Sequence, residues 1–395
     1  MSGEDNAVNL SINKNKNKKM KKYLSITTIA ILFAGILFSC KKGSPGTIPV
    51  PPAGGTYTKI NYTGTANLSE ARKYLAAAAT GNKIVFAGGN IATAPYYSKV
   101  VDIYDVTNNT WAAAQLSEAR FELVGAGAGN KIVFAGGLNA TGYSKAVDIY
   151  DVVTNTWTTA QLSVARSALC AVSSGNKIYF AGGETNRGTT GSSKVVDIYD
   201  VSNNTWATAQ LSETRSYLSA AAAGNKIVFC GGHNSSTGLD SRTVDIFDIS
   251  SSTWSTSLLS TARYQSSANA AGNKIIIAGG TNSTTGTALN RVDIYDVSTN
   301  TWSVDQLSAG RWYIASASGG NKIVFAGGFN GGPEFQVKTV DIYDVVTNTW
   351  VTSQLSEARG GMGAATAGNK ILFGGGETGT GSGLSSTVDI FTLSN

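Results

Sequence analysis

Histidine is almost absent from this 395-residue chain, which has one, and cysteine, methionine and proline are scarce at three, three and six residues. A single histidine excludes a cage of several histidines around a metal ion and most histidine-dependent catalytic centres. We therefore expect neither a metal site nor a cofactor.

Glycine is abundant instead, at 46 residues, and threonine, serine, asparagine and alanine are also frequent. Such a composition is typical of short strands joined by tight turns, and it fits neither a long helical bundle nor a disordered chain. Hydrophobic residues make up 42% of the sequence, which is enough for a core.

The net charge of +6 lies mostly in the first 39 residues, where six lysines face only Glu4 and Asp5 and so contribute +4. The remaining residues carry only +2. A basic surface for nucleic acid is therefore not expected.

Residues 1–39 have the organisation of a secretory signal peptide. Lys21 and Lys22 precede an apolar run over residues 23–38 that is short for a membrane span. The sequence Leu-Phe-Ser-Cys that ends at Cys40 resembles the lipobox of bacterial lipoproteins, which implies that Cys40 is lipidated and becomes the mature N-terminus. The alternative is an uncleaved signal anchor.

Residues 41–55 contain four of the six prolines with glycines between them, a composition that predicts a tether. The layout resembles lipoproteins of Gram-negative bacteria, which implies a lipid anchor in the cell envelope as the only membrane contact. No aspartate directly follows Cys40, which favours the outer membrane. Which side of that membrane the protein faces is left open.

One unit recurs seven times after residue 56. Each copy has an arginine, a strand of small residues, a Gly-Asn turn, a Lys-Ile-Val-Phe-Ala-type strand that ends in Gly-Gly, and a Val-Asp-Ile-Tyr-Asp-type strand. A Thr-Asn turn and a tryptophan strand follow in six copies, and the Gly-Gly doublets are 46 to 49 residues apart. Small residues suit strands around a crowded axis. The sequence predicts an all-β, seven-bladed β-propeller of four-stranded antiparallel blades over residues 56–395.

The unit resembles the kelch repeat. The resemblance rests on the arginine, the Gly-Gly doublet, and a Tyr-Asp pair with a tryptophan six residues later, as in Tyr104, Asp105 and Trp111, and it covers about 330 residues. The last copy ends without its tryptophan strand, whereas residues 57–62 precede the first copy. We expect this N-terminal segment to supply the missing strand and close the ring.

Most of the repeated residues have a structural interpretation. The glycine doublets let neighbouring blades meet, each Tyr and Trp pair packs between blades, and Cys170 and Cys230 are small packing residues that do not pair. The seven arginines make a repeated contact, for instance with the aspartate of the Tyr-Asp pair. The alternative is that the arginines present positive charge to an anionic ligand.

One face of the propeller, where the chain enters the first strand and leaves the second, differs from copy to copy. Alternation along a strand is expected to put the residue two past each arginine and the residue after it on opposite sides. Departures from the repeat at one position indicate a ligand site, and kelch propellers often bind partners there, although ordinary exposed loop residues are the alternative. The candidate ligand-binding residues are Tyr74, Glu122, Tyr217, Gln265, Trp312, Tyr313, Tyr97 and Phe335.

We expect a non-catalytic binding or interaction module, tethered to the envelope, that takes a glycan or a protein at this mouth. The alternative is a sugar-modifying enzyme resembling sialic-acid epimerase or mutarotase, with Glu122 and the arginines as its groups. A copper-dependent sugar oxidase needs paired histidines, and the chain has only His233. A structural or adhesive surface protein is a third possibility, and no residue is assigned a catalytic role.

Overall fold

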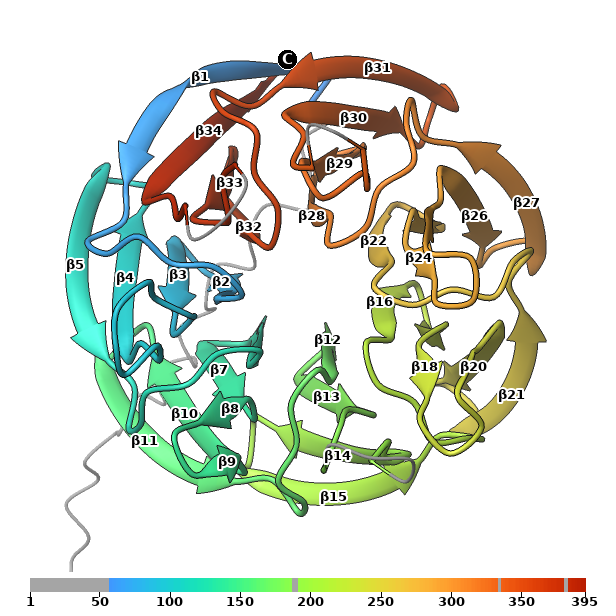
Figure 1. Ribbon diagram of the computed structural model, residues 1–395, viewed down its shortest axis with the longest axis horizontal. Helices are drawn as coiled ribbons and strands as arrows, with labels where there is room; N and C mark the ends of the chain where they lie inside the picture. The colour runs from blue at the N-terminus through green and yellow to red at the C-terminus, as the bar shows by residue number, and fades with distance from the viewer. Residues whose placement is uncertain (1–56, 187–190, 333–334, 380–382) are drawn as a thin grey trace, which may run out of the picture. The chain divides into compact units, whose positions relative to one another are not determined.

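The computed structural model describes residues 57–186, 191–332, 335–379 and 383–395. The predicted signal peptide over 1–39, Cys40 and the tether over 41–55 lie outside the described residues. No helix long and apolar enough to cross a membrane occurs in the described ranges. Seven four-stranded antiparallel sheets surround one axis (Figure 1), so the predicted seven-bladed β-propeller is confirmed.

The two inner strands of each blade are five residues long and correspond to the small-residue strand and the strand that ends in Gly-Gly. The innermost strands are β2 (Ala76–Thr80), β6 (Val124–Ala128), β12 (Cys170–Ser174), β16 (Ser219–Ala223), β22 (Ser267–Ala271), β28 (Ala315–Gly319) and β32 (Gly363–Ala367). The second strands are β3 (Lys83–Ala87), β7 (Lys131–Ala135), β13 (Lys177–Ala181), β17 (Lys226–Cys230), β23 (Lys274–Ala278), β29 (Lys322–Ala326) and β33 (Lys370–Gly374).

The two outer strands of each blade carry the aspartate and tryptophan phrases. The third strands are β4 (Val100–Asp105), β10 (Ala146–Asp151), β14 (Val195–Asp200), β20 (Thr243–Asp248), β26 (Arg291–Asp296), β30 (Thr339–Asp344) and β34 (Thr387–Ser394). The fourth strands are β5 (Thr110–Gln115), β11 (Thr156–Gln161), β15 (Thr205–Gln210), β21 (Thr253–Leu258), β27 (Thr301–Gln306), β31 (Thr349–Gln354) and, in the seventh blade, β1 (Lys59–Asn67).

Three blades carry a short hairpin in the loop that follows the Gly-Gly doublet. These hairpins are β8 (Leu138–Asn139) with β9 (Gly142–Tyr143), β18 (His233–Asn234) with β19 (Leu239–Asp240), and β24 (Thr281–Asn282) with β25 (Thr287–Ala288).

The two ends of the described chain close the ring, as expected. The N-terminal strand β1 pairs antiparallel with β34, from Lys59 opposite Ser394 to Asn67 opposite Thr387. The seventh blade also meets the first, because the Gly376 amide donates to the Arg72 carbonyl at 2.9 Å. The seventh blade therefore has its fourth strand, and no blade of the ring lacks a neighbour.

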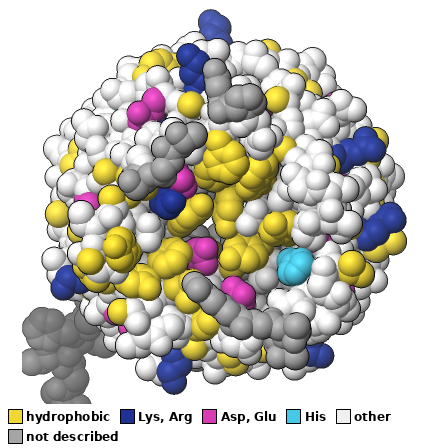
Figure 2. Space-filling model, in the orientation of Figure 1, with side chains coloured by type: hydrophobic (Ala, Val, Ile, Leu, Met, Phe, Trp, Pro, Cys, Tyr) yellow, Lys and Arg dark blue, Asp and Glu magenta, His cyan; other side chains and the backbone are white. Residues whose placement is uncertain are grey.

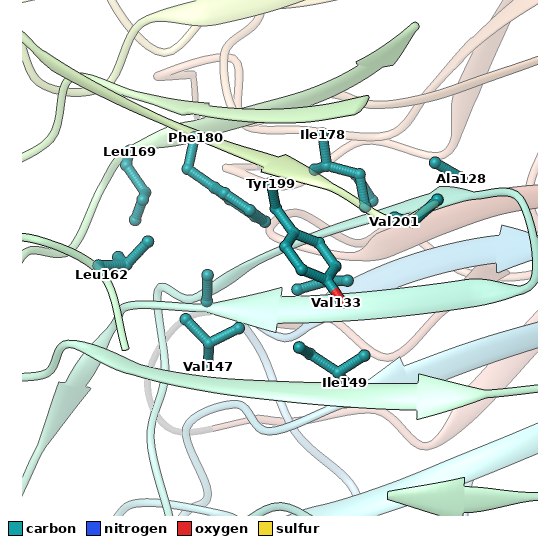
Figure 3. Packing of buried hydrophobic residues seen from close by; sticks show 12 residues of the cluster. Ala128, Val133, Val147, Ile149, Leu162, Leu169, Ile178, Phe180, Tyr199 and Val201 are labelled. Atoms are coloured by element: carbon teal, nitrogen blue, oxygen red, sulfur yellow. The ribbon is translucent and has the colours of Figure 1, made fainter. Parts of the chain in front are cut away.

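Hydrophobic side chains form the core between adjacent blades. In the cluster of Figure 3, Val133 and Val147 of the second blade pack against Phe180 and Tyr199 of the third, and Trp206 packs at its edge. The Tyr199 and Trp206 rings are stacked with centroids 4.8 Å apart. The expectation that the Tyr and Trp pairs pack between blades is confirmed.

The seven arginines are fully buried and form ion pairs within their own blades, so the structural interpretation is confirmed. The suggested partner, however, was wrong. Arg72 pairs with Asp102, the first aspartate of the third strand, whereas Asp105 pairs with Lys83, which lies directly opposite it in the sheet. The other pairs are Arg120 with Asp148, Arg166 with Asp197, Arg215 with Asp245, Arg263 with Asp293, Arg311 with Asp341 and Arg359 with Asp389.

The glycine doublets lie where neighbouring blades meet, as predicted. A Cβ atom on Gly88 would come within 2.6 Å of the Arg120 carbonyl of the next blade, and Gly88 has a φ of +65°. Both the close approach and the backbone angle therefore require glycine here.

Cys170 and Cys230 are both free and buried, which confirms that they do not pair. Burial raises the pKa of the Cys170 thiol to about 12 and that of Cys230 to about 11. Both thiols therefore stay protonated near neutral pH and behave as small packing groups.

Candidate functional site

Seven equivalent residues, each two positions past a buried arginine, surround the propeller axis on one face. We call them the mouth ring. All seven adopt the left-handed backbone conformation, with φ between 49° and 67°, although only one is glycine. The mouth ring consists of Tyr74, Glu122, Ala168, Tyr217, Gln265, Tyr313 and Gly361.

Backbone hydrogen bonds link the mouth ring from blade to blade. The Tyr74 amide donates to the Gly361 carbonyl at 2.9 Å, and the Glu122 amide donates to the Tyr74 carbonyl at 3.1 Å. The same contact recurs at Tyr217, Gln265 and Gly361 over 2.8 to 3.4 Å. The backbone of the mouth ring is therefore part of the repeat, whereas its side chains differ from blade to blade.

The left-handed bend interrupts the extended chain before the innermost strand begins, so the simple alternation of a strand does not apply across it. The residue after each mouth-ring residue also lines the pocket and packs in the core between blades, as Leu123 does beside Gly88. These following residues form an apolar collar with one serine. The collar consists of Leu75, Leu123, Leu169, Leu218, Ser266, Ile314 and Met362.

The mouth ring and the collar enclose a pocket of about 220 Å³ at the end of the propeller axis. Two further cavities, of about 270 and 440 Å³, share lining residues with one another and continue along the innermost strands. Figure 2 shows hydrophobic side chains, tyrosine included, gathered around the centre of this face with acidic side chains among them. The pocket is thus the entrance to an axial channel.

Three tyrosines make up most of the pocket's aromatic surface. The Tyr74 and Tyr313 rings are 5.2 Å apart between centroids, and the Tyr74 ring lies across Gly361, where a Cβ atom would come within 2.8 Å of it. Burial, and then the negative charge of nearby glutamates, raises the pKa of Tyr74, Tyr217 and Tyr313 above the ordinary value. The three hydroxyls therefore stay neutral across the physiological range.

Polar groups come from two other blades. Glu122 accepts a hydrogen bond from the Ser167 hydroxyl at 3.4 Å, and its charge contributes to the raised pKa of all three tyrosines. Gln265 lines the opposite part of the pocket. The structure thus brings five of the eight candidate residues, Tyr74, Glu122, Tyr217, Gln265 and Tyr313, into one pocket.

The remaining three candidates do not line that pocket. Trp312 and Phe335 lie beside it with their rings 5.7 Å apart, and both contact Phe329. Tyr97 packs against Phe121 at 5.6 Å. These aromatic groups form an outer rim, and Phe329 joins that rim to Tyr313 at 6.0 Å.

Sequence reasoning missed Glu184, Phe329 and Glu377, which follow the glycine doublets directly. Each forms a β-bridge with the residue after its own blade's arginine, as Glu377 does with Gly360. His233 occupies the same position in the fourth blade, where its Nδ1 lies 2.9 Å from Asp240. Their position in the repeat could have identified them, because the strand that ends in Gly-Gly runs towards the mouth and the next residue lies on that face.

The comparisons with known proteins bear on this geometry. The KLHDC2/KLHL20/DRC7 Kelch-repeats domain model matches residues 127–304 and again residues 218–394, which together make up more than half of the chain. The chain belongs to the kelch-repeat family. No curated protein matches it. Kelch propellers typically mediate protein interactions, so the fold is that of a protein-binding scaffold.

The burial of the arginines argues against two alternatives, an anionic ligand held by the arginines and an epimerase that uses them. Each arginine has a side-chain exposure of 0% and is engaged by an aspartate, as Arg120 is by Asp148. The arginines therefore present no charge to an anionic ligand at the mouth. They also cannot hold a substrate carboxylate there, which removes the cationic groups that the epimerase alternative needed.

Proposed function

We propose that this kelch propeller is a non-catalytic binding module of the bacterial cell envelope, anchored through a lipidated Cys40 and recognising a glycan or protein partner at the mouth ring. The observation that carries the proposal is the convergence of Tyr74, Tyr217 and Tyr313 on one axial pocket with Glu122 and Gln265. Aromatic faces beside a few polar groups are typical of ligand sites. Nothing in the repeat itself requires these side chains, since other copies have alanine or glycine there.

The direction of the chain supports an anchor that leaves the mouth accessible. Strand β1 begins at Lys59, opposite Ser394, at the end of the seventh blade where the Gly-Asn turns lie. The mouth ring lies at the other end of the innermost strands. The chain therefore enters β1 on the face away from the mouth.

The binding proposal is tested with a glycan array and with protein capture from the envelope fraction of the source cells. The wild-type chain is compared with a variant in which Tyr74, Tyr217 and Tyr313 are changed to alanine. We expect selective binding by the wild type that the folded variant loses. The matched control changes Tyr57, Tyr62 and Tyr96, which lie outside the pocket, to alanine. Equal binding by the two variants would place the site elsewhere.

The anchor is tested separately by labelling cells with a radioactive fatty acid. We expect label on the wild-type chain and none on Cys40→Ser, with the variant released into the soluble fraction. Label that persists in Cys40→Ser would contradict the lipoprotein assignment and leave the mouth ring untouched as a binding site.

A further inference from the structure

We propose that His233, on the rim of the mouth, is a preset hydrogen-bond acceptor for an amide N–H group in a peptide segment of a protein partner. This inference rests on the proposed function, because it specifies the partner of the same mouth and selects a peptide over a glycan. The structural feature that carries it is the buried carboxylate of Asp240, which holds the imidazole ring at one nitrogen and leaves the other for a ligand.

The contact with Asp240 determines which nitrogen of the imidazole carries the proton. Nδ1 of His233 lies 2.9 Å from Oδ1 of Asp240, and a carboxylate accepts hydrogen bonds but does not donate them. Nδ1 of the neutral ring therefore holds the proton, which leaves a lone pair on Nε2. Nε2 makes no hydrogen bond within the described part of the chain, and the His233 side chain is 28% exposed. The ring thus presents an acceptor at the surface.

Asp240 is itself held in place by the next blade. The Ser283 amide donates to its Oδ2 at 2.6 Å and the Ser283 hydroxyl donates to its Oδ1 at 2.9 Å, and the Asp240 side chain is only 2% exposed. The backbone of His233 is fixed as well, in a β-bridge with Ser216. Rigid support of this kind, with a buried carboxylate that sets the orientation of a surface imidazole, is typical of a histidine that acts on a ligand.

Aromatic rings connect His233 to the pocket. The His233 ring lies 5.8 Å from the Tyr264 ring, and the Tyr264 ring lies 6.2 Å from the ring of Tyr217, which lines the pocket. Figure 2 shows the histidine on the same face as the hydrophobic side chains at the centre of the mouth. A peptide in the pocket therefore reaches His233 across Tyr264, with its apolar side chains against the two tyrosine rings.

The fixed tautomer favours an amide over a hydroxyl group as the ligand. A hydroxyl both donates and accepts, so a sugar would bind either tautomer of histidine, whereas an amide N–H only donates and requires the acceptor form. An extended peptide carries such a group at every residue except proline. Kelch propellers typically mediate protein interactions, which agrees with a peptide as the ligand.

The tautomer is tested by nitrogen NMR of the full chain, in which His233 is the only histidine. We expect the wild type at about pH 8 to carry its proton on Nδ1. In Asp240→Asn the asparagine oxygen stays with the Ser283 amide, which can only donate, so the NH2 group donates to Nδ1 and the proton moves to Nε2. The matched control is Asp305→Asn, whose carboxylate accepts from the Trp350 indole N–H, and it is expected to leave the His233 signals unchanged. A wild-type proton on Nε2 would overturn the inference.

The partner group is tested with heptapeptides that are selected on the full chain from a random display library and synthesised with blocked ends. Each backbone amide is then methylated in turn, which removes one N–H group. We expect one position at which methylation lowers the affinity of the wild type and of Asp305→Asn about fivefold or more. The same methylation is expected to have little effect on binding to Asp240→Asn, because Nε2 of His233 no longer accepts.

The outcomes separate this inference from the proposed function. Equal losses on methylation in the wild type and Asp240→Asn would overturn the role of His233 and would still support a peptide site at the mouth. Failure to select any peptide, with glycans bound in a way that depends on the mouth tyrosines, would overturn the inference while supporting the proposed function. No selected peptide, no bound glycan and no captured protein would contradict both.

Discussion

A residue with a left-handed backbone angle lies at each end of every innermost strand, but the two ends differ in which residue types occupy that position. At the turn end, a residue with φ of 54° to 58° is glycine in all seven blades. At the mouth end, a residue with φ of 49° to 67° is glycine only once. The turn glycines are Gly81, Gly129, Gly175, Gly224, Gly272, Gly320 and Gly368.

A left-handed conformation costs about 1 to 2 kcal/mol for a residue with a Cβ atom. At the turns the sequence avoids that cost, and a Cβ atom on Gly175 would meet nothing within 4 Å, so the angle alone explains the glycine. At the mouth, six of the seven residues in this conformation have a Cβ atom and therefore carry that cost. Backbone strain of this kind clusters at functional sites, so it supports the mouth ring as the candidate site without reference to the pocket.

The largest expected effect on the scaffold is the loss of a buried ion pair. Asp341→Ala leaves the fully buried Arg311 without its partner, and we expect a loss of about 3 to 5 kcal/mol in the free energy of unfolding. Asp344→Ala, three residues along β30, removes a more exposed pair with Lys322 and the hydrogen bonds that the carboxylate accepts from the Val346 and Thr347 amides, and it is expected to cost less. Denaturant unfolding measures both, and equal losses would contradict the scaffold role of the arginine ring.

The two ends of β12 test the backbone comparison directly. Gly175→Ala introduces a Cβ atom at φ +57° in open space, and we expect it to destabilise the protein by about 1 kcal/mol. Ala168→Gly removes a Cβ atom at φ +50°, and we expect it to stabilise the protein by up to about 1 kcal/mol. Thermal unfolding of the two variants gives both signs. Destabilisation by Ala168→Gly would mean that the mouth conformation carries no strain.

The differences between the copies indicated a candidate site at the mouth, and the blade number and the closing strand were predictable because they follow from the period and the chain ends. The left-handed bend was not, since tyrosine, glutamate and alanine at Tyr74, Glu122 and Ala168 give no glycine signal. The arginine's partner was also missed, because it depends on the pairing of β3 with β4, in which Lys83 lies opposite Asp105 and Asp102 is left for Arg72.

The grouping of Tyr74 with Tyr313 could not be predicted either. These residues are 239 positions apart, and only ring closure puts the sixth blade's tyrosine and the first blade's tyrosine on either side of Gly361. Sequence alternation treats each blade alone, whereas the pocket depends on contacts between blades. Trp312, Phe335 and Tyr97 were predicted as ligand-binding candidates but do not line the pocket. The sequence could not separate them from the mouth ring for the same reason, because their ring contacts depend on how the loops fold.

The prediction with the smallest expected effect is a pH titration that compares the mouth tyrosines with the other tyrosines. Burial raises the pKa of Tyr74, Tyr217 and Tyr313 above the ordinary value of 10.0, so the folded protein holds these protons more tightly than the unfolded chain. Their contribution to stability is complete below pH 10 and is lost as the pH rises above it. Burial also raises the pKa of scaffold tyrosines such as Tyr199 and Tyr295. We expect the absorbance titration of tyrosinate to show a late fraction that becomes smaller when the three mouth tyrosines are changed to phenylalanine.

The triple variant should also lose less stability than the wild type between pH 10 and the unfolding limit, because phenylalanine has no proton to lose. If the late fraction is unchanged in the triple variant, the late-titrating groups all belong to the scaffold tyrosines. The difference between the mouth ring and the scaffold would then be supported by backbone strain alone.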